Sequence, residues 1–119
     1  MFDDGTPIFT QIATRLVADI MSGAYPEGGQ VPSINELAAF YRINPATANR
    51  AVAGLVDEGI LVKRRGIGMF VAEGAREAIA AQRRMAFVAS YVEPLLAEAR
   101  ALGIDLTTLI DLITKEARP

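Results

Sequence analysis

The side chains that most often perform catalysis are absent from this sequence. It has no histidine and no cysteine, so it lacks the usual general base, the thiolate nucleophile and the commonest metal ligand. Its only serines are Ser22, Ser33 and Ser90, and there is no histidine to activate their hydroxyl groups. The sequence therefore predicts a protein that is not an enzyme and that holds no cofactor and no metal ion.

The stretch from Asn44 to Gly59 is better suited to hydrogen bonding with a nucleic acid. Asn44 is a favourable N-cap, Pro45 suits the first position of a helix, and Gly59 suits the position after its last turn. One side of this helix is an apolar stripe made of Ala48, Ala51, Val52, Leu55 and Val56. The other side begins with small or polar residues and one cation, namely Ala46, Thr47, Asn49, Arg50 and Ala53. Because such a side can approach a base-pair edge closely, we interpret this as a recognition helix. The alternative is an ordinary exposed helix start.

A second cluster of candidate contacts is basic. Lys63, Arg64 and Arg65 are consecutive and precede Gly66, in a segment that reads as the turn of a β-hairpin. A basic, flexible tip of this kind can enter a minor groove or contact phosphates. The alternative is a solvated turn, which is what charge runs usually are. We expect Arg65 to be the strongest contact of the group.

Local signals predict the elements that would position these residues. A helix is expected at 7–22, followed by a loop or short extended edge at 24–32 that is rich in Pro and Gly. Ser33 and Glu36 form a capping-box pattern, which begins a short helix. This helix and the one at 44–58 are joined by about three residues, which matches a helix-turn-helix, and the hairpin that follows adds a wing.

The rest of the chain predicts helices with an uncovered apolar side. A long helix is expected from residue 73 to about residue 102, and Pro94 should kink it or divide it near Tyr91–Val92. Asp105 caps a short last helix. So much apolar helix exceeds what the first domain can cover, so we expect a homodimer. Packing back on the winged helix is the alternative. The expected dimerisation residues are Met85, Val88, Val92, Leu95, Leu96, Leu102, Leu109 and Ile113.

These signals give one fold class and two domains. The fold class is mainly α with a small β-hairpin, a winged helix-turn-helix followed by a C-terminal helical dimerisation segment. The winged helix-turn-helix DNA-binding domain is expected at 1–72, with residues 1–6 as a loose arm. The dimerisation segment is expected at 73–119.

Composition limits the class of protein further. Hydrophobic residues make up 51% of the 119 residues and charged residues 22%, which excludes a disordered chain. No apolar run reaches the ~20 residues of a membrane-spanning helix, so we expect a cytoplasmic protein with no membrane partner. The net charge of −2 is not that of a bulk nucleic-acid binder. A winged-helix protein-interaction module without DNA binding therefore stays the alternative function.

A series of short motifs runs through residues 7–72. They are Pro7-Ile8-Phe9-x-Gln11-Ile12, Ser22-Gly23-x-Tyr25-x-x-Gly28, Val31-Pro32-Ser33, Glu36-Leu37-Ala38, Asn44-Pro45-x-Thr47, Glu58-Gly59-Ile60-Leu61 and Gly66-x-Gly68-x-Phe70-Val71. Their combination resembles the winged-helix domain of the GntR family of bacterial transcription regulators. The Ile-Asn-Pro-x-Thr form of the turn, with only two short helices after the wing, resembles the YtrA subfamily.

The resemblance implies a dimeric repressor whose C-terminal helices mainly dimerise. Dimer symmetry then requires an inverted-repeat DNA operator. Asn35 stands where the family commonly uses an arginine to contact DNA, and Ser33 begins a helix whose N-terminus can bind a phosphate. The expected DNA contacts are Ser33, Asn35, Asn44, Ala46, Thr47, Asn49, Arg50, Lys63, Arg64, Arg65 and Gly66.

A small-molecule effector that releases the repressor is a further hypothesis. Arg83, Arg84, Phe87 and Tyr91 could line a pocket between the long helix and the winged helix, although nothing in the sequence requires a ligand. For Arg83 and Arg84 the alternative is a solvated or salt-bridged face.

Overall fold

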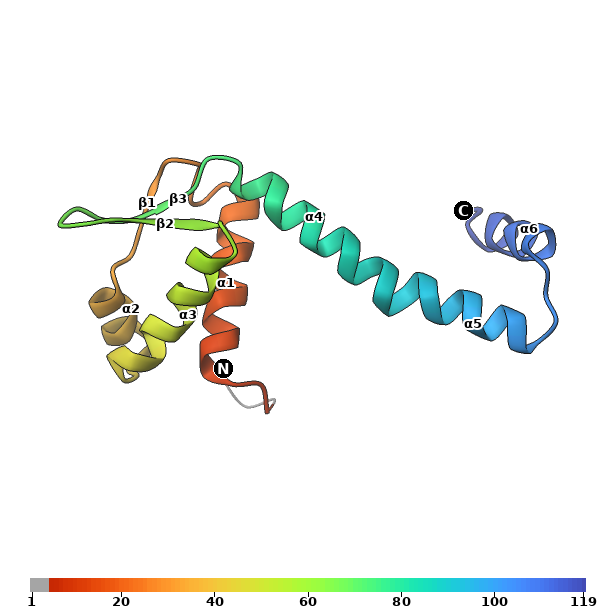
Figure 1. Cartoon of the computed structure of the whole chain (residues 1–119), viewed down its shortest axis with the longest axis horizontal. Helices are drawn as coiled ribbons and strands as arrows, with labels where there is room; N and C mark the ends of the chain where they lie inside the picture. The colour runs from red at the N-terminus through yellow and green to blue at the C-terminus, as the bar shows by residue number, and fades with distance from the viewer. Residues whose placement is uncertain (1–4) are drawn as a thin grey trace. The chain divides into compact units, whose positions relative to one another are not determined.

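The computed structural model describes residues 5–119, so the first four residues of the predicted arm at 1–6 lie outside it. Contacts divide the chain into two compact units, one ending at Ala80 and one beginning at Ala81. The elements in chain order are α1 (Ile8–Ser22), β1 (Gln30–Val31), α2 (Ile34–Tyr41), α3 (Pro45–Asp57), β2 (Leu61–Arg64), β3 (Gly68–Val71), α4 (Ala75–Phe87), the π-helical segment η1 (Val88–Val92), α5 (Glu93–Ala101) and α6 (Leu106–Glu116) (Figure 1).

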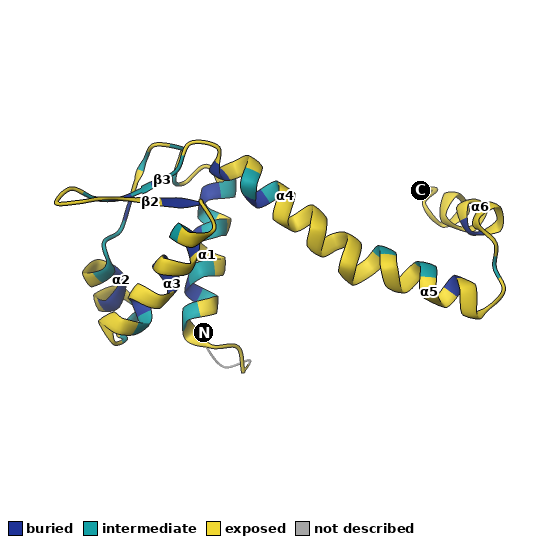
Figure 2. Cartoon of the chain, in the orientation of Figure 1, coloured by how far each residue is buried: buried dark blue, intermediate teal, exposed yellow. Residues whose placement is uncertain are grey.

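Three helices enclose the core of the first unit. Both α1 and α2 pack against α3, and all three helices contribute buried residues to one core (dark blue in Figure 2). Ile12, Leu16 and Ile20 of α1 recur every four residues and are all buried, as their helical spacing predicts. The predicted stripe of the recognition helix also lies in the core, with buried Ala48, Ala51, Val52 and Leu55 and half-buried Val56. The helix-turn-helix is therefore held by an apolar core.

The predicted ends of α3 are confirmed. The Asn44 side-chain oxygen accepts a hydrogen bond from the Ala46 N–H at 2.8 Å, and Pro45 occupies the first turn. Gly59 follows the helix at φ 78°, in the left-handed region that favours glycine. The Ile60 N–H then donates to the Leu55 carbonyl at 2.9 Å, which satisfies one of the last free carbonyls of the helix.

The sheet has one strand more than the predicted hairpin. Its order is β1-β3-β2, and both pairings are antiparallel. β2 and β3 form the expected wing, while β1 comes from the segment read as a loop or extended edge. Val31 of β1 lies opposite Met69 of β3, and both are buried, so this short strand closes one edge of the core. The predicted fold class is confirmed, with a three-stranded sheet in place of a lone hairpin.

The first unit extends beyond the predicted boundary at residue 72, as far as Ala80. Ala75 and Ile79 of α4 are buried in its core. The Glu27 carboxylate accepts hydrogen bonds from the N–H groups of Gly74 at 2.8 Å and Arg76 at 3.1 Å. In return, the Arg76 guanidinium donates to the carbonyls at 20 and 21, at 3.1 and 2.9 Å. We call these four bonds the α4 clasp; they tie the start of α4 to the end of α1.

A π-helical turn accommodates Pro94 in the long helical tract. The segment η1 (Val88–Val92) lies directly before α5, where the Glu93 N–H donates to the Val88 carbonyl. Pro94 then occupies the first turn of α5, where its missing N–H leaves no bond unmade. The π-helical segment separates α4 from α5 at the place where Pro94 was expected to disturb the long helix.

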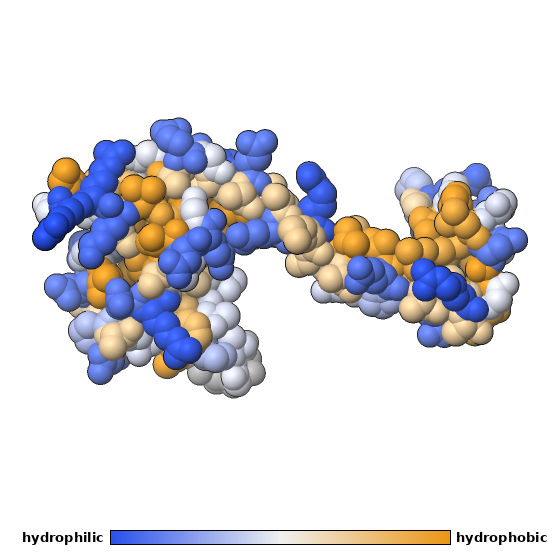
Figure 3. Space-filling model, in the orientation of Figure 1, coloured by the Kyte–Doolittle hydropathy of each residue, from blue (hydrophilic) through white to orange (hydrophobic). Residues whose placement is uncertain are grey.

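The second unit exposes much of its apolar surface. Figure 3 shows hydrophobic side chains gathered over α5 and α6. A groove of about 520 Å³ runs between these helices, lined by Leu95, Glu98, Ala99, Leu102, Ile104, Leu109, Leu112, Ile113, Glu116 and Ala117. Within the described part of the chain, no helix is both long enough and apolar enough to span a bilayer.

Candidate nucleic-acid interface

The start of α3 presents small and polar groups to the outside. Asn44, Ala46, Asn49 and Arg50 are exposed, and Thr47 is half-buried. The side facing inward consists of the buried stripe, so α3 keeps a clear division between a packed and an open face. Alanine and threonine next to asparagine give little steric bulk and several hydrogen-bonding groups, which suits contact with base edges.

The turn before α3 has an unusual backbone. Arg42 ends α2 at φ 56°, and its N–H donates to the Ala38 carbonyl. This left-handed conformation costs an ordinary residue roughly 1–2 kcal/mol. The short turn needs it, because the chain must reverse between two helices that pack together. The Asn44 cap uses the side-chain oxygen, so its amide N–H groups point away from that bond and are suited to donate to DNA.

Arg50 is held against α1. Its guanidinium carbon lies 4.1 Å from the centroid of the Phe9 ring, a cation–π distance. Phe9 is half-buried and packs against the core. The arginine therefore lies along the surface of the helix pair while its side chain stays exposed.

The start of α2 already holds an anion. The Ser33 hydroxyl accepts from the Glu36 N–H at 3.1 Å, and the Ser33 N–H donates to the Glu36 carboxylate at 2.9 Å. The predicted capping box is confirmed. The Ser33 backbone and then its hydroxyl hold the pKa of Glu36 below its usual value of 4.5. The ionised carboxylate thus takes up the Ser33 N–H, while Asn35 beside it is exposed.

The wing is a two-stranded ribbon with a basic tip. Lys63, Arg64 and Arg65 are all exposed, and Arg64 lies over the Phe70 ring at 4.7 Å. Gly66 allows the tight reversal at φ 75°. The tip also carries an apolar residue, Ile67, which is 67% exposed. In Figure 1 the hairpin and the α2–α3 pair both extend toward the left of the first unit.

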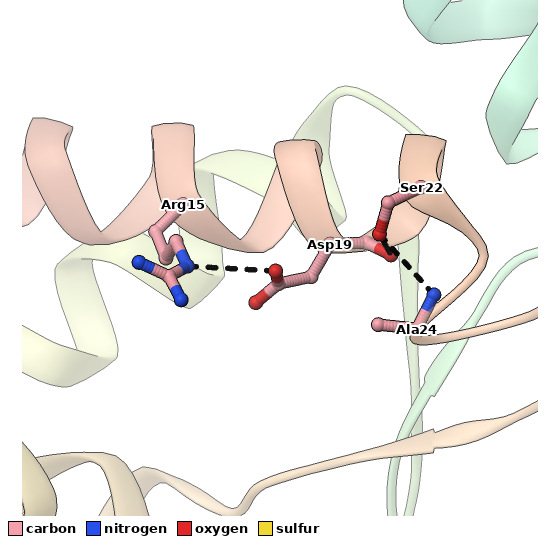
Figure 4. A network of polar contacts seen from close by, with 4 residues as sticks. All are labelled: Arg15, Asp19, Ser22 and Ala24. Carbon is pink, nitrogen blue, oxygen red and sulfur yellow. Dashed lines mark hydrogen bonds and ion pairs between the residues drawn. The ribbon is translucent and has the colours of Figure 1, made fainter.

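One serine hydroxyl that could be considered for catalysis has a structural role. Ser22 donates to the Asp19 carbonyl at 3.0 Å and accepts from the Ala24 N–H at 3.4 Å (Figure 4). Arg15 pairs with the Asp19 carboxylate at 3.4 Å in the same network. These contacts end α1. Over residues 5–119, no group of three or more carboxylates or other ligands could hold a metal ion.

Seven of the eight predicted dimerisation residues stay accessible in the single chain. Met85 is 74% exposed and Leu102 is 65% exposed, while Val92 and Leu96 are half-buried. Leu109 is the exception at 6% exposed. It packs within the second unit, where it also lines the groove between α5 and α6. Helical spacing alone does not distinguish an internal from an external apolar face.

The predicted effector residues lie on the surface of the second unit. Arg83, Arg84, Phe87 and Tyr91 are exposed. The rings of Phe87 and Tyr91 approach each other, with centroids 5.6 Å apart. These two rings therefore form a small aromatic patch one helical turn in length.

Sequence reasoning missed several residues that shape the interface. Phe9 appeared only in the first of the short motifs, and its contact with Arg50 joins residues far apart in the chain. Glu27 and Arg76 gave no local pattern, because their partners in the α4 clasp lie at least 47 residues away. Arg42 could have been found from the shortness of the turn, which demands a left-handed residue.

A protein-family model matches more than half of the chain. The family described as bacterial regulatory proteins of the gntR family matches residues 9–71, the segment from α1 to the end of β3. A relative named HTH-type transcriptional repressor YtrA, from Bacillus subtilis, is 30% identical over 91% of this chain and 82% of its own length.

Solved structures share the fold. A transcriptional regulator of the GntR family from Bacteroides thetaiotaomicron has a TM-score of 0.73 and 32% identity, covering 91% of this chain and 94% of its own. The DNA-binding domain of AraR, in complex with its operator ORR3, has a TM-score of 0.52 and 28% identity. That match covers 54% of this chain and 77% of the AraR domain.

Proposed function

The chain belongs to the GntR family of bacterial regulatory proteins and is a DNA-binding transcription regulator rather than an enzyme, and on this premise we propose that it represses transcription by occupying an inverted-repeat operator as a homodimer. The relative from Bacillus subtilis carries the name of a repressor, which favours repression over activation. A regulator of the chromosome acts in the cytoplasm, so we assign it there.

The observation that carries this proposal is the open face at the start of α3. That face offers Thr47, Asn49 and Arg50 beside the small Ala46, with the opposite face fixed in the core. We assign this part of α3 to the major groove, where side-chain donors and acceptors can distinguish base pairs. Arg50 is assigned to a guanine or a phosphate, and Asn44 to the adjacent backbone.

The wing is the second proposed contact. Lys63, Arg64, Arg65 and Gly66 are assigned to the neighbouring minor groove or its phosphates. The start of α2 ranks third, because the Glu36 carboxylate would repel a phosphate at Ser33. Asn35 is exposed. It offers an amide in place of a charge, so we expect it to contact DNA only at short range.

The homodimer is proposed from the apolar surface of the second unit. Met85, Val88, Leu95, Leu102 and Ile113 each expose at least 41% of their surface, and an apolar patch of this kind is typical of an association surface. A two-fold dimer is the simplest closed arrangement. It requires two operator half-sites related by symmetry, about 10 bp or a multiple of it apart.

A small effector is further proposed to bind at Arg83, Arg84, Phe87 and Tyr91. The paired rings of Phe87 and Tyr91 and the two nearby cations suit a flat anionic molecule. Such a molecule would release the operator only if it bound one dimer geometry more tightly than the other.

The proposal is tested by selecting DNA from a random library with the purified full-length chain. We expect the enriched sequences to share one inverted repeat. In a reporter strain, deleting the gene for the chain should raise transcription from a promoter that contains this repeat. No enrichment, even at low salt, would instead favour the protein-interaction module. Enrichment of single half-sites would contradict the dimer.

A further inference from the structure

Arg50 of α3 and Phe9 of α1 form a contact between the two helices. The guanidinium carbon lies 4.1 Å from the centroid of the ring. Phe9 is in the first turn of α1, is half-buried and packs against the core, so its ring is fixed. Arg50 is exposed, and an exposed arginine is one of the most flexible side chains. The ring is therefore the fixed partner and the guanidinium the movable one.

Stacking of this kind prepares an arginine for binding. A flexible side chain loses conformational freedom when it contacts DNA, and this loss opposes binding. A guanidinium already held on a ring loses less. An arginine can place the flat face of its guanidinium on an aromatic ring, which leaves its five N–H groups free in the plane. Those donors stay suited to a phosphate or to the acceptor edge of guanine.

We propose that Phe9 is a positioning residue for DNA binding: its ring holds Arg50 ready on the outer face of α3. The inference rests on the proposed contact between Arg50 and DNA. The helix α1 supplies the ring and would therefore take part in recognition without contacting the operator itself.

The wing contains a second contact of the same kind. Arg64 lies over the Phe70 ring at 4.7 Å, and Phe70 sits in β3, between β1 and β2. Two arginines of the proposed interface, from different elements, thus each lie over a phenylalanine ring. Within residues 5–119, Arg65 at the tip has no such ring and no ion pair. Because the same kind of contact occurs twice, a role in holding the cations explains it better than chance does.

The rival explanation is purely structural, since a ring between α1 and α3 also contributes to packing. The two explanations differ in one respect. A packing role affects DNA binding whatever residue stands at position 50, whereas a positioning role requires the arginine. A double-mutant cycle separates them.

The experiment measures operator binding by four full-length variants: Phe9→Leu, Phe9→Tyr, Arg50→Ala and the double Phe9→Leu/Arg50→Ala. Leucine keeps the apolar packing and removes the ring face, and tyrosine keeps the ring. We expect Phe9→Leu to weaken operator binding about two- to fivefold and Phe9→Tyr to bind like the wild type. In the Arg50→Ala background, Phe9→Leu should cause no further loss.

Equal losses from Phe9→Leu in both backgrounds would overturn the inference in favour of packing, and no loss in the wild-type background would overturn it outright. If Arg50→Ala binds the operator normally, the proposed DNA contact of Arg50 fails instead. Circular dichroism and thermal unfolding check that each variant folds. If Phe9→Leu does not fold, Phe9→Met makes the same comparison with a more adaptable apolar side chain.

Discussion

At the scale of residues, the proposed interface depends on a few cations in a chain of net charge −2. Arg50 lies on α3, and Lys63, Arg64 and Arg65 form the wing tip. Each phosphate neutralised by a cation releases counterions and steepens the salt dependence of binding. With so few cations, sequence recognition must come largely from the polar groups at the start of α3.

Replacing Arg50 tests this division directly. We expect Arg50→Ala to weaken operator binding by ~1–3 kcal/mol, because alanine cannot make a bidentate pair of hydrogen bonds with a guanine. Binding to random DNA should change much less. Fluorescence anisotropy on both DNAs measures the two effects, with Arg15→Ala as a control, since Arg15 is an exposed arginine of α1 paired with Asp19. Equal losses on both DNAs would show a phosphate contact instead.

The wing is tested by the triple variant Lys63→Ala/Arg64→Ala/Arg65→Ala. We expect a shallower slope of log affinity against log salt, by about one for each phosphate that the wing no longer neutralises. The matched control is Arg100→Ala/Lys115→Ala/Arg118→Ala, which removes three exposed cations from the second unit. A slope that stays the same in the wing variant would remove the wing from the interface.

At the scale of elements, local signals predicted most of the first unit. The Ser33–Glu36 capping box, the Asn44 cap and Gly59 each act within a few residues, so their patterns are visible in the sequence and the structure confirms them. The β1 strand and the α4 clasp depend on partners far along the chain. No local pattern in the sequence identifies such pairs. The same reason explains why the contact of Phe9 with Arg50 was not predicted.

The α4 clasp predicts a dependence of stability on pH. The N–H of Gly74 and then that of Arg76 hold the pKa of Glu27 below its usual 4.5. The ionised form is therefore favoured by folding, and the resulting stability is present above pH 4.5 and lost as the pH falls below it. Glu27→Gln should lower the free energy of unfolding in urea at pH 7, and the difference from the wild type should shrink at pH values below 4.5.

The matched control for the clasp is Glu77→Gln, an exposed glutamate of the same helix. Its carboxylate makes no hydrogen bond within the described residues, so its substitution should have a smaller effect at neutral pH. If Glu27→Gln and Glu77→Gln behave alike at both pH values, the clasp contributes nothing that depends on the charge of Glu27.

At the scale of the whole molecule, the two units are proposed to have different roles, DNA binding for the first and dimerisation for the second. The first unit has a closed apolar core, whereas the second leaves large apolar side chains exposed. Helical spacing identified that exposed stripe but also included Leu109, which the structure buries. In a dimer, the symmetry of the second unit would set the symmetry of the operator.

A charge in the apolar stripe tests the dimer. Leu95 is 42% exposed and lines the groove between α5 and α6. We expect Leu95→Asp to give monomers by light scattering and to weaken operator binding, because burying an unpaired carboxylate in an apolar interface is costly. Thr107→Asp, which adds the same charge at an exposed polar position of α6, should stay dimeric. A dimer of unchanged mass for Leu95→Asp would refute this interface.

The most direct test of the whole account is binding of the full-length chain to the selected operator and to scrambled DNA of the same composition, each at two salt concentrations. For a dimeric repressor we expect tight binding to the operator alone, one footprint across both half-sites, and two chains per operator. Equal and weak binding to both DNAs, lost together as salt rises, would contradict it.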